Sequence, residues 1–410
     1  MIDRSLLPPK GTKDLPPELA ILFEEIVSKI EEKFKEYGFD PVITPIVEYW
    51  EILKGKYGEE AEKKEIWRFK IPQSKKWYAL KYDQTVPLAR FFARFQPKLP
   101  FKRYVIDRTY RYDEPQKGRY REFWQADADI VGSKYPEADA EIINLMIDIY
   151  DSLGFKDSYI RISDRRALEN IVKEVDEKEK FLEIARIIDK WDKIGKEGVL
   201  SELKKITNKA EKIIEKLEEN PEEYYPKEFL EIIDLVENKN RLSIDIKLAR
   251  GFDYYTGMIY EVWMKDFNRA IGGGGRYDNL IKTFVGKEIP AVGGSIGINP
   301  LIDVGLEKGI FRINRKTYTK VAVVYIGNTF REAWNIANKL RKAGLYVYID
   351  LMRRNFKKQM DYVVEKDVRY LIIVGEVDLK ENKVTFQDRK THEKIKIEID
   401  NLEKIKEFID

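Results

Sequence analysis

The order of β-rich and helix-rich segments along the chain restricts its fold more than any other feature of the sequence. An amphipathic helix is predicted at 17–37, where apolar residues recur with a 3.6-residue period between Pro17 and Gly38. The β-prone runs that follow are 42–44, 66–71, 77–81, 101–112 and 120–130. The last two flank a polar loop at 113–119, which predicts a strand, a long loop and a second strand. This part of the chain is therefore expected to form an antiparallel sheet with flanking helices.

A Lys- and Glu-rich helical stretch at 165–240 interrupts the β-rich part. Helical periodicity is clear at 181–191 and 203–217, and β-prone segments resume at 242 and continue through 258–264. We therefore expect a helical insertion within one domain. The expected division is a first domain at 1–164 and 241–316, the insertion at 165–240 and a separate domain at 317–410.

The segment after Lys316 alternates strands with helices. Strands are expected at 321–326, 346–349 and 370–374, with a helix at 330–343 and another before the last strand. This βαβαβ order predicts a small α/β domain with a largely parallel core. The whole chain is thus predicted to combine an α+β domain, a helical insertion and a C-terminal α/β domain.

The composition excludes several kinds of chemistry. With no cysteine in 410 residues, the chain has no disulfide, thiolate metal site or cysteine nucleophile. Its one histidine, His392, stands in a polar stretch that predicts an exposed turn, so Ser-His-Asp chemistry and a histidine-based zinc site are excluded as well. Any catalysis must use Arg, Lys, carboxylates and bound cations.

The balance of charged and apolar residues indicates a globular chain with a highly charged surface. Charged residues make up 36% and hydrophobic residues 43%. No run approaches the roughly 18 apolar residues that span a bilayer, and no apolar leader opens the chain, so a cytoplasmic location without membrane contact is expected. Heavy use of Lys and Glu also fits a thermophile. The net charge of +3 permits a nucleic-acid partner without requiring one.

The segment TYRYDEPQKGRYREFWQADAD at 109–129 carries the first group of candidate site residues. Strand alternation places Phe123, Gln125, Asp127 and Asp129 on one face. Such a face presents an amide and two carboxylates to a polar ligand, while the arginines of the loop neutralise phosphate. A charged hairpin with cross-strand ion pairs is the alternative interpretation.

Two further segments are LARGFDYYTG at 248–257 and GGGGRYDNL at 272–280. Four successive glycines remove every Cβ from one turn, which allows a ligand or another backbone to approach closely; the alternative is a flexible hairpin turn. Neither GxGxxG nor GxxxxGK[ST] occurs, so any bound ATP is not held by a P-loop.

Together with PPKGTKDLPPE at 8–18, these segments resemble the histidyl-tRNA synthetase family over nearly the whole chain. The 109–129 segment is similar to motif 2 of class II aminoacyl-tRNA synthetases, with a QADAD ending like that of the archaeal and eukaryotic branch. The other two resemble the signatures that distinguish histidyl enzymes. The resemblance implies ATP-dependent ligation of L-histidine to tRNA(His) through histidyl-adenylate by a homodimer. It also implies Mg²⁺ as the pyrophosphate counterion, no organic prosthetic group, and an anticodon-binding C-terminal domain.

The resemblance also implies which residues bind histidine and catalyse its activation. The histidine-binding residues are Asp83, Thr85, Arg111, Gln125, Asp129, Arg250, Tyr254 and Tyr255. Asp83 and Thr85, assisted by Gln125, are expected to hold the amino group. Asp129 and Tyr255 are expected to pair with the two imidazole nitrogens. Arg111 and Arg250 are the implied catalytic residues, because fixed guanidinium groups stabilise the charge that develops when a carboxylate attacks the α-phosphate.

Phosphate and RNA contacts are implied for basic residues elsewhere. The implied ATP-binding residues are Arg111, Arg119, Arg121 and Gly297, and the implied tRNA-binding residues are Gln116, Lys117, Arg353, Arg354, Lys357 and Lys358. The last four are expected within two turns of one helix, a cluster that suits RNA phosphates but that also fits a solvated helix end. The ligands of Mg²⁺ remain unassigned.

Two positions depart from the family pattern. Pro300 stands where the motif 3 arginine that grips the γ-phosphate is expected, and Lys81 stands where an arginine is common. Proline suits the first turn of a helix but carries no charge, so another cation, such as Arg119, Arg121 or Arg276, is needed to replace the lost contact. Pro300 favours an alternative function, that of the non-catalytic synthetase-like regulatory subunit of ATP phosphoribosyltransferase. A protein that binds RNA without forming the adenylate is a third possibility.

Overall fold

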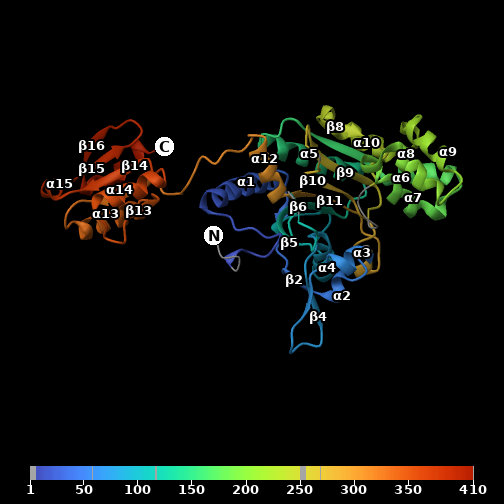
Figure 1. Ribbon diagram of the computed structural model, residues 1–410, viewed down its shortest axis with the longest axis horizontal. Helices are drawn as coiled ribbons and strands as arrows, with labels where there is room; N and C mark the ends of the chain where they lie inside the picture. The colour runs from blue at the N-terminus through green and yellow to red at the C-terminus, as the bar shows by residue number, and fades with distance from the viewer. Residues whose placement is uncertain (1–5, 58, 116–117, 250–254, 268, 410) are drawn as a thin grey trace. The chain divides into compact units, whose positions relative to one another are not determined.

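The computed structural model describes residues 6–57, 59–115, 118–249, 255–267 and 269–409, without the side chains of residues 59–61. The chain divides into two compact units, residues 1–14 with 26–311 and residues 15–25 with 312–410 (Figure 1). Within the described residues, none of the helices combines the length and apolar character that crossing a bilayer requires.

The first unit is built on a large mixed sheet. Among the described residues its strands follow the spatial order β1 (Asp40–Pro41), β5 (Phe101–Tyr110), β6 (Glu122–Val131), β11 (Ala291–Gly297), β10 (Gly272–Arg276), β9 (Met258–Met264), β7 (Ser158–Asp164) and β8 (Leu242–Ile244). The inner strands pair antiparallel, whereas β1 and β8 run parallel to their neighbours. The expected antiparallel sheet is therefore confirmed for its interior and is wrong at both edges.

One face of this sheet is apolar and the other is polar. On β6, Ala126, Ala128 and Ile130 alternate with Gln125, Asp127 and Asp129. Helix α5 (Pro136–Ser152) packs on the apolar face, where a Cβ added to Gly294 would lie 2.9 Å from Met146 Cε. The polar residues consequently face the other side, as the alternation predicts.

The four successive glycines form β10, between β9 and β11, and the hairpin-turn interpretation is wrong. A Cβ added to Gly274 would overlap the backbone carbonyl oxygen of Gly293 on the adjacent strand. The close approach of another backbone is therefore the correct interpretation of the glycine run.

The N-terminal part of the chain supplies helices and a small sheet, and all of these except residues 17–25 of the first helix belong to the first unit. Helix α1 (Pro17–Glu36) confirms the first predicted helix. The strand expected at 42–44 is wrong, because pairing with β5 ends soon after β1. The amide of Val42 still donates to Tyr104 O, but Pro45 has no amide hydrogen with which to continue the pairing. The small sheet has the order β2 (Val47–Tyr49), β4 (Trp77–Leu80), β3 (Arg68–Lys70). Short helices α2 (Trp50–Leu53) and α3 (Glu59–Lys64) and the longer α4 (Thr85–Phe95) accompany it.

Between β7 and β8 the chain is helical, as its Lys- and Glu-rich pattern indicates. The helices are α6 (Arg165–Glu174), α7 (Phe181–Ile188), α8 (Trp191–Lys204), α9 (Ala210–Glu218) and α10 (Lys227–Leu235). The helical periodicity at 203–217 spans a break between two helices, because α8 ends at Lys204 and the Thr207 hydroxyl accepts a hydrogen bond from the Lys209 amide before α9 begins. This turn is stabilised by a threonine side chain, and the spacing of apolar residues in the sequence continues across it almost unchanged.

The second unit is a small α/β domain. Its sheet, among the described residues, has the order β13 (Val347–Ile349), β12 (Val321–Tyr325), β14 (Tyr370–Val374), β15 (Lys383–Asp388), β16 (Lys394–Glu398), and its longer helices are α13 (Phe330–Lys342) and α14 (Phe356–Glu365). The parallel pairing of β13, β12 and β14 confirms the predicted core, while β15 and β16 add an antiparallel edge that we did not predict. His392 lies in the exposed turn that joins them, as expected.

Candidate active site

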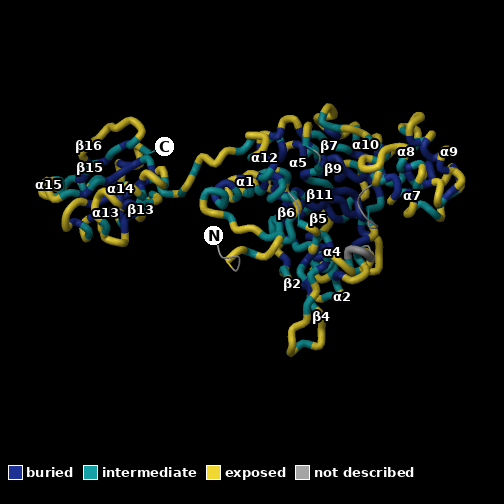
Figure 2. Tube along the Cα trace, viewed as in Figure 1, coloured by how far each residue is buried: buried dark blue, intermediate teal, exposed yellow. Residues whose placement is uncertain are grey.

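The polar face of β6 gathers buried polar side chains. Gln125, Asp127 and Asp129 are 8%, 4% and 3% exposed, and Arg103 opposite Asp129 on β5 is 1% exposed. Figure 2 shows the middle of the sheet around β9 and β11 in dark blue, whereas the hairpin beyond β4 is yellow. Buried charges of this kind are costly unless they are paired or meet a ligand.

Arg103 and Tyr277 hold the carboxylate of Asp129. Arg103 Nη2 lies 2.7 Å from Asp129 Oδ2 and donates to the carbonyl oxygen of Gln84 at 3.0 Å. The Tyr277 hydroxyl donates to Asp129 Oδ1. Burial raises the pKa of Asp129, and the charge of Arg103 and the Tyr277 hydrogen bond offset part of this effect.

Gln125, Ser295 and Asp127 form a second group. Gln125 Nε2 donates to Ser295 Oγ at 2.7 Å, and the Ser295 hydroxyl hydrogen-bonds to Asp127. Burial raises the pKa of Asp127 to about 7, because the favourable charge of Arg103 and the Ser295 hydrogen bond only partly compensate for lost hydration. The carboxyl group of Asp127 is thus partly protonated near neutral pH.

Asp83 lies two residues before helix α4. Its Oδ1 accepts hydrogen bonds from the Tyr57 hydroxyl at 2.9 Å and from the amides of Thr85 and Val86 at 3.2 and 3.1 Å. Burial raises the pKa of Asp83, although these hydrogen bonds and the charge of Arg111 oppose the rise. Asp83 and Thr85 are therefore fixed in one place by the start of α4.

Arg111 lies over aromatic rings beside the polar face. Its Nε donates to the carbonyl oxygen of Tyr82 at 3.2 Å, and its Cζ lies 4.6 Å from the centroid of the Tyr82 ring. The Phe123 ring, on the same face of β6 as Gln125, has its centroid 5.3 Å from the same Cζ. These contacts bring the guanidinium group, Asp83 and the β6 residues to one side of the sheet.

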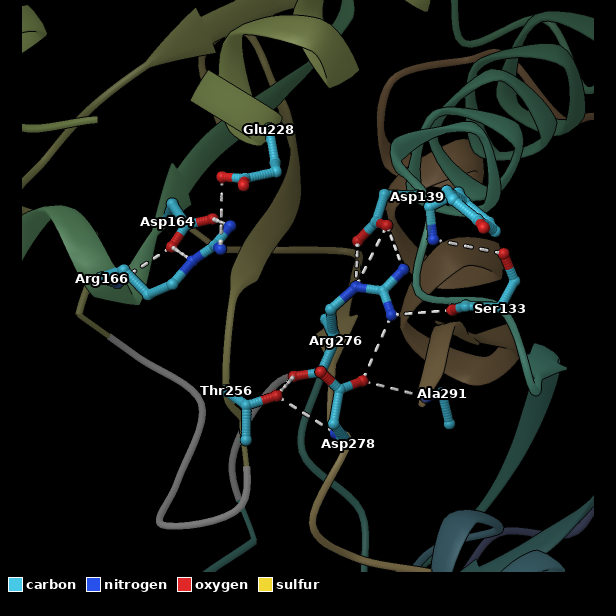
Figure 3. A network of polar contacts seen from close by, with 10 residues as sticks. Ser133, Asp139, Asp164, Arg166, Glu228, Thr256, Arg276, Asp278 and Ala291 are labelled. Carbon is cyan, nitrogen blue, oxygen red and sulfur yellow. Dashed lines mark hydrogen bonds and ion pairs between the residues drawn. The ribbon is translucent and has the colours of Figure 1, made fainter. Parts of the chain in front are cut away.

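Tyr255 lies beside this group, and an ion pair on the opposite face fixes the strand behind it. A Cβ added to Gly275 would lie 3.1 Å from the Tyr255 ring, and the amide of the next residue, Thr256, donates to Arg276 O at 2.8 Å. Figure 3 shows the Arg276 guanidinium group directed toward Asp139 on α5, to which Nε donates at 3.0 and 3.1 Å. The suggestion that Arg276 replaces the missing phosphate ligand is therefore wrong, because its guanidinium group is committed to Asp139.

Arg111 directly follows β5, and the other implied ATP-binding residues lie just before β6 or at the end of β11. The Arg121 Cζ stacks 3.8 Å from the centroid of the Tyr112 ring, and Arg119 is exposed. Gly297 ends β11 and precedes α12 (Ile298–Glu307), with Pro300 in the first turn as expected. A cavity of about 310 Å³ beside Pro300 is also lined by Gly118, Arg269, Asp303 and Glu307. Arg269 was not among the residues that the sequence singled out.

Several expected site residues lie outside the described part of the chain, namely Arg250, Tyr254, Gln116 and Lys117. Within the described residues, no group of three or more acidic or histidine side chains forms a metal site. The metal ligands therefore stay unassigned.

The basic cluster of the second unit differs from its prediction. Arg353 has a left-handed backbone and stacks 4.9 Å from the Phe330 ring, and Arg354 pairs with Asp350 at 2.5 Å. Helix α14 begins only after Asn355, whose side chain accepts a hydrogen bond from the Lys358 amide. The expectation that all four basic residues share one helix is thus wrong, since only Lys357 and Lys358 belong to α14.

Sequence reasoning missed the residues that hold the site together, which are Tyr57, Arg103, Tyr277 and Ser295. The position of Arg103 was predictable in principle, since it lies on the same face as Val105 and Asp107 of the strand that pairs with β6. Its partner, however, depends on strand register, which no local pattern of β5 specifies.

A sheet of this topology, with a strand–loop–strand pair that carries Arg111 and the polar face of β6, is typical of the class II aminoacyl-tRNA synthetase fold. The family model described as histidyl-tRNA synthetase matches residues 11–301, and that described as an anticodon binding domain matches 320–407. The histidine–tRNA ligase of Nanoarchaeum equitans is 76% identical over 98% of this chain and 100% of its own. The chain belongs to the histidyl-tRNA synthetase family.

Solved structures agree with this assignment. The histidyl-tRNA synthetase of Nostoc sp. PCC 7120 matches with a TM-score of 0.82 and 28% identity, over 98% of this chain and 99% of that chain. A Bacillus halodurans C protein described as an ATP phosphoribosyltransferase regulatory subunit/histidyl-tRNA synthetase matches with a TM-score of 0.75 over 90% of this chain and 98% of that chain. Its 19% identity supports a common fold and nothing more specific.

Proposed function

We propose that this chain joins L-histidine to tRNA(His) at the expense of ATP, through a histidyl-adenylate intermediate. The observation that carries the proposal is the grouping of Asp83, Arg111, Gln125 and Asp129 on one side of the sheet. An amino acid with a positive ammonium group and a polar ring needs buried carboxylates and amides of this kind. Family membership gives the amino acid its identity.

Arg111 supports the activation step. The histidine carboxylate attacks the α-phosphorus of ATP in line with the departing pyrophosphate, so two anions must approach one another. In this proposal Arg111 and Arg250 neutralise the charge that accumulates, each worth on the order of 3 kcal/mol in the transition state. Stacking on Tyr82 and Phe123 holds Arg111 in position before the substrates arrive.

Phosphate binding must compensate for Pro300. Arg119, Arg121 and Arg269 are the candidate cations beside the motif 2 loop and the start of α12. The described residues include no group of three or more acidic or histidine side chains that could hold a metal ion. Mg²⁺ is proposed to arrive bound to the ATP phosphates, which are strong ligands for it.

The second unit is proposed to bind the anticodon stem of the tRNA. Lys357 and Lys358 lie in the first turn of α14, where the helix dipole adds to their positive charge. Gln116 and Lys117 are proposed to contact the acceptor end. The proposed active form is a homodimer in the cytoplasm, the compartment in which tRNA is charged.

The regulatory-subunit alternative is not favoured, because the relative with 76% identity over the full length is a histidine–tRNA ligase. Charging of tRNA(His) transcripts with radiolabelled histidine tests the proposal. We expect ATP-dependent charging by the purified chain, and light scattering should give the mass of a dimer. Tight binding of the transcript without charging would instead support an RNA-binding protein that lacks the reaction.

A further inference from the structure

Asp127 is a buried carboxylate on the polar face of β6 to which the proposed function gives no role. It lies between Gln125 and Asp129 on that face and is 4% exposed. Its Oδ1 has no hydrogen-bond partner within the described part of the chain. A carboxylate oxygen that is buried without a partner is destabilising. A ligand is therefore expected to donate a hydrogen bond to this oxygen.

The amide of Gln125 indicates the same place. Its Nε2 donates to Ser295 Oγ at 2.7 Å, so the single hydroxyl hydrogen of Ser295 is left to donate to Asp127. Gln125 Oε1 is likewise buried without a partner among the described residues. Gln125 Oε1 and Asp127 Oδ1, on alternate residues of one strand face, thus both lack a partner among the described residues. The next acceptor on that face, Asp129 Oδ2, has no hydrogen bond in the described part of the chain either, but it lies 2.7 Å from Arg103 Nη2.

The charged groups around Asp127 do not supply the missing donor within the described residues. Arg103 on β5 lowers the pKa of Asp127, but its Nη2 is held at 2.7 Å by Asp129. Asp129 on β6 and Asp83 before α4 are carboxylates that raise this pKa. The charge of Asp127 contributes to the raised pKa of Tyr260 on the apolar face of β9, but the Tyr260 hydroxyl makes no hydrogen bond to Asp127. Such surroundings favour an added cation with several N–H groups.

We propose that Asp127 contacts the substrate directly, and that its Oδ1 and Gln125 Oε1 together accept hydrogen bonds from the α-ammonium group of histidine. This inference rests on the proposed function and adds a binding residue to it. An ammonium group has three N–H donors and a permanent charge, so it can serve both oxygens. A neutral imidazole has a single N–H and would leave one of them without a partner.

Proton release is a consequence of this contact. Because burial raises the pKa of Asp127 to about 7, its carboxyl group is partly protonated near neutral pH before histidine binds. The arriving ammonium group favours the ionised carboxylate, and the proton passes to the buffer. Histidine affinity is therefore expected to rise with pH up to about 7.

Calorimetric titration of histidine into the full chain, without ATP, tests the inference in two buffers that differ in ionisation enthalpy. We expect Asp127→Asn to weaken binding by at least about tenfold at about pH 8 and to abolish the proton release of the unmodified chain near pH 7. Asp148→Asn removes an exposed carboxylate from α5 and should keep the original affinity. Circular dichroism verifies that each variant is folded.

Two analogues separate a direct contact from a structural role. L-Histidinol keeps the ammonium group, whereas 3-(imidazol-4-yl)propionate lacks it. Asp127→Asn should weaken histidinol binding as much as histidine binding and should leave the deaminated analogue within about twofold. Unchanged histidine affinity, an equal loss for both analogues, or no histidine binding to the unmodified chain would overturn the inference. Failure of the proposed function is a different result, namely histidine binding without tRNA charging.

Discussion

Replacement of Asp127 by asparagine is expected to stabilise the ligand-free protein at high pH. An increase in the pKa of Asp127 from 3.8 to about 7 corresponds to a free-energy difference of roughly 4 kcal/mol between its two protonation states, since one pKa unit equals about 1.36 kcal/mol. The folded carboxyl group binds its proton more tightly than the unfolded one. Its contribution to stability is thus fully present below about pH 4 and is lost as the pH rises through about 7.

Asparagine cannot ionise, so the variant avoids this loss. We expect its free energy of unfolding to match that of the unmodified chain near pH 4 and to exceed it by about 4 kcal/mol at about pH 8. Urea unfolding followed by tryptophan fluorescence measures the difference in the first unit, which contains every tryptophan except Trp334. Asp148→Asn again controls for the loss of one charge. A difference that does not grow with pH would show that Asp127 is ionised and solvated in the free protein, contrary to our reasoning.

Three further changes test other parts of the structure. Arg103→Met should lower the free energy of unfolding of the first unit by about 3–5 kcal/mol, because it leaves the buried Asp129 without its ion-pair partner. The double variant Arg103→Met with Asp129→Leu should recover most of this stability. Additive losses in the double variant would contradict the pairing. Gly274→Ala should lower the free energy of unfolding of the first unit by about 1–3 kcal/mol, since the methyl group overlaps a backbone carbonyl oxygen; an unchanged free energy would contradict the close approach of the two strands. Arg111→Ala should lower kcat for histidine activation by about 10²–10³-fold in pyrophosphate exchange, and a change in KM alone would refute its proposed catalytic role.

The polar face of the site was predictable because a strand has a fixed period. Alternation along 120–130 was enough to place Gln125, Asp127 and Asp129 together, and the polar loop before them marked the strand pair. The βαβαβ core of the second unit followed from similarly local patterns. Both predictions depended on neighbours in the sequence.

What escaped prediction depends on contacts between distant residues. Four glycines in a row predicted the close approach of a ligand or another backbone, but they did not show that the glycines form a central strand, where neighbouring backbones and the Tyr260 side chain leave no room for side chains on β10 and β11. The pairing of Arg103 with Asp129 depends on the register of β5 against β6. The cavity beside Pro300 brings Arg269 and Gly118 together from loops far apart in the sequence.

Histidine-dependent exchange of labelled pyrophosphate into ATP tests the central claim most directly, because it isolates activation of the amino acid on the polar face of the sheet. We expect exchange with histidine well above that with any other standard amino acid, by a chain without cysteine and with its one histidine in an exposed turn. Folded protein that binds histidine and ATP but supports no exchange would contradict it.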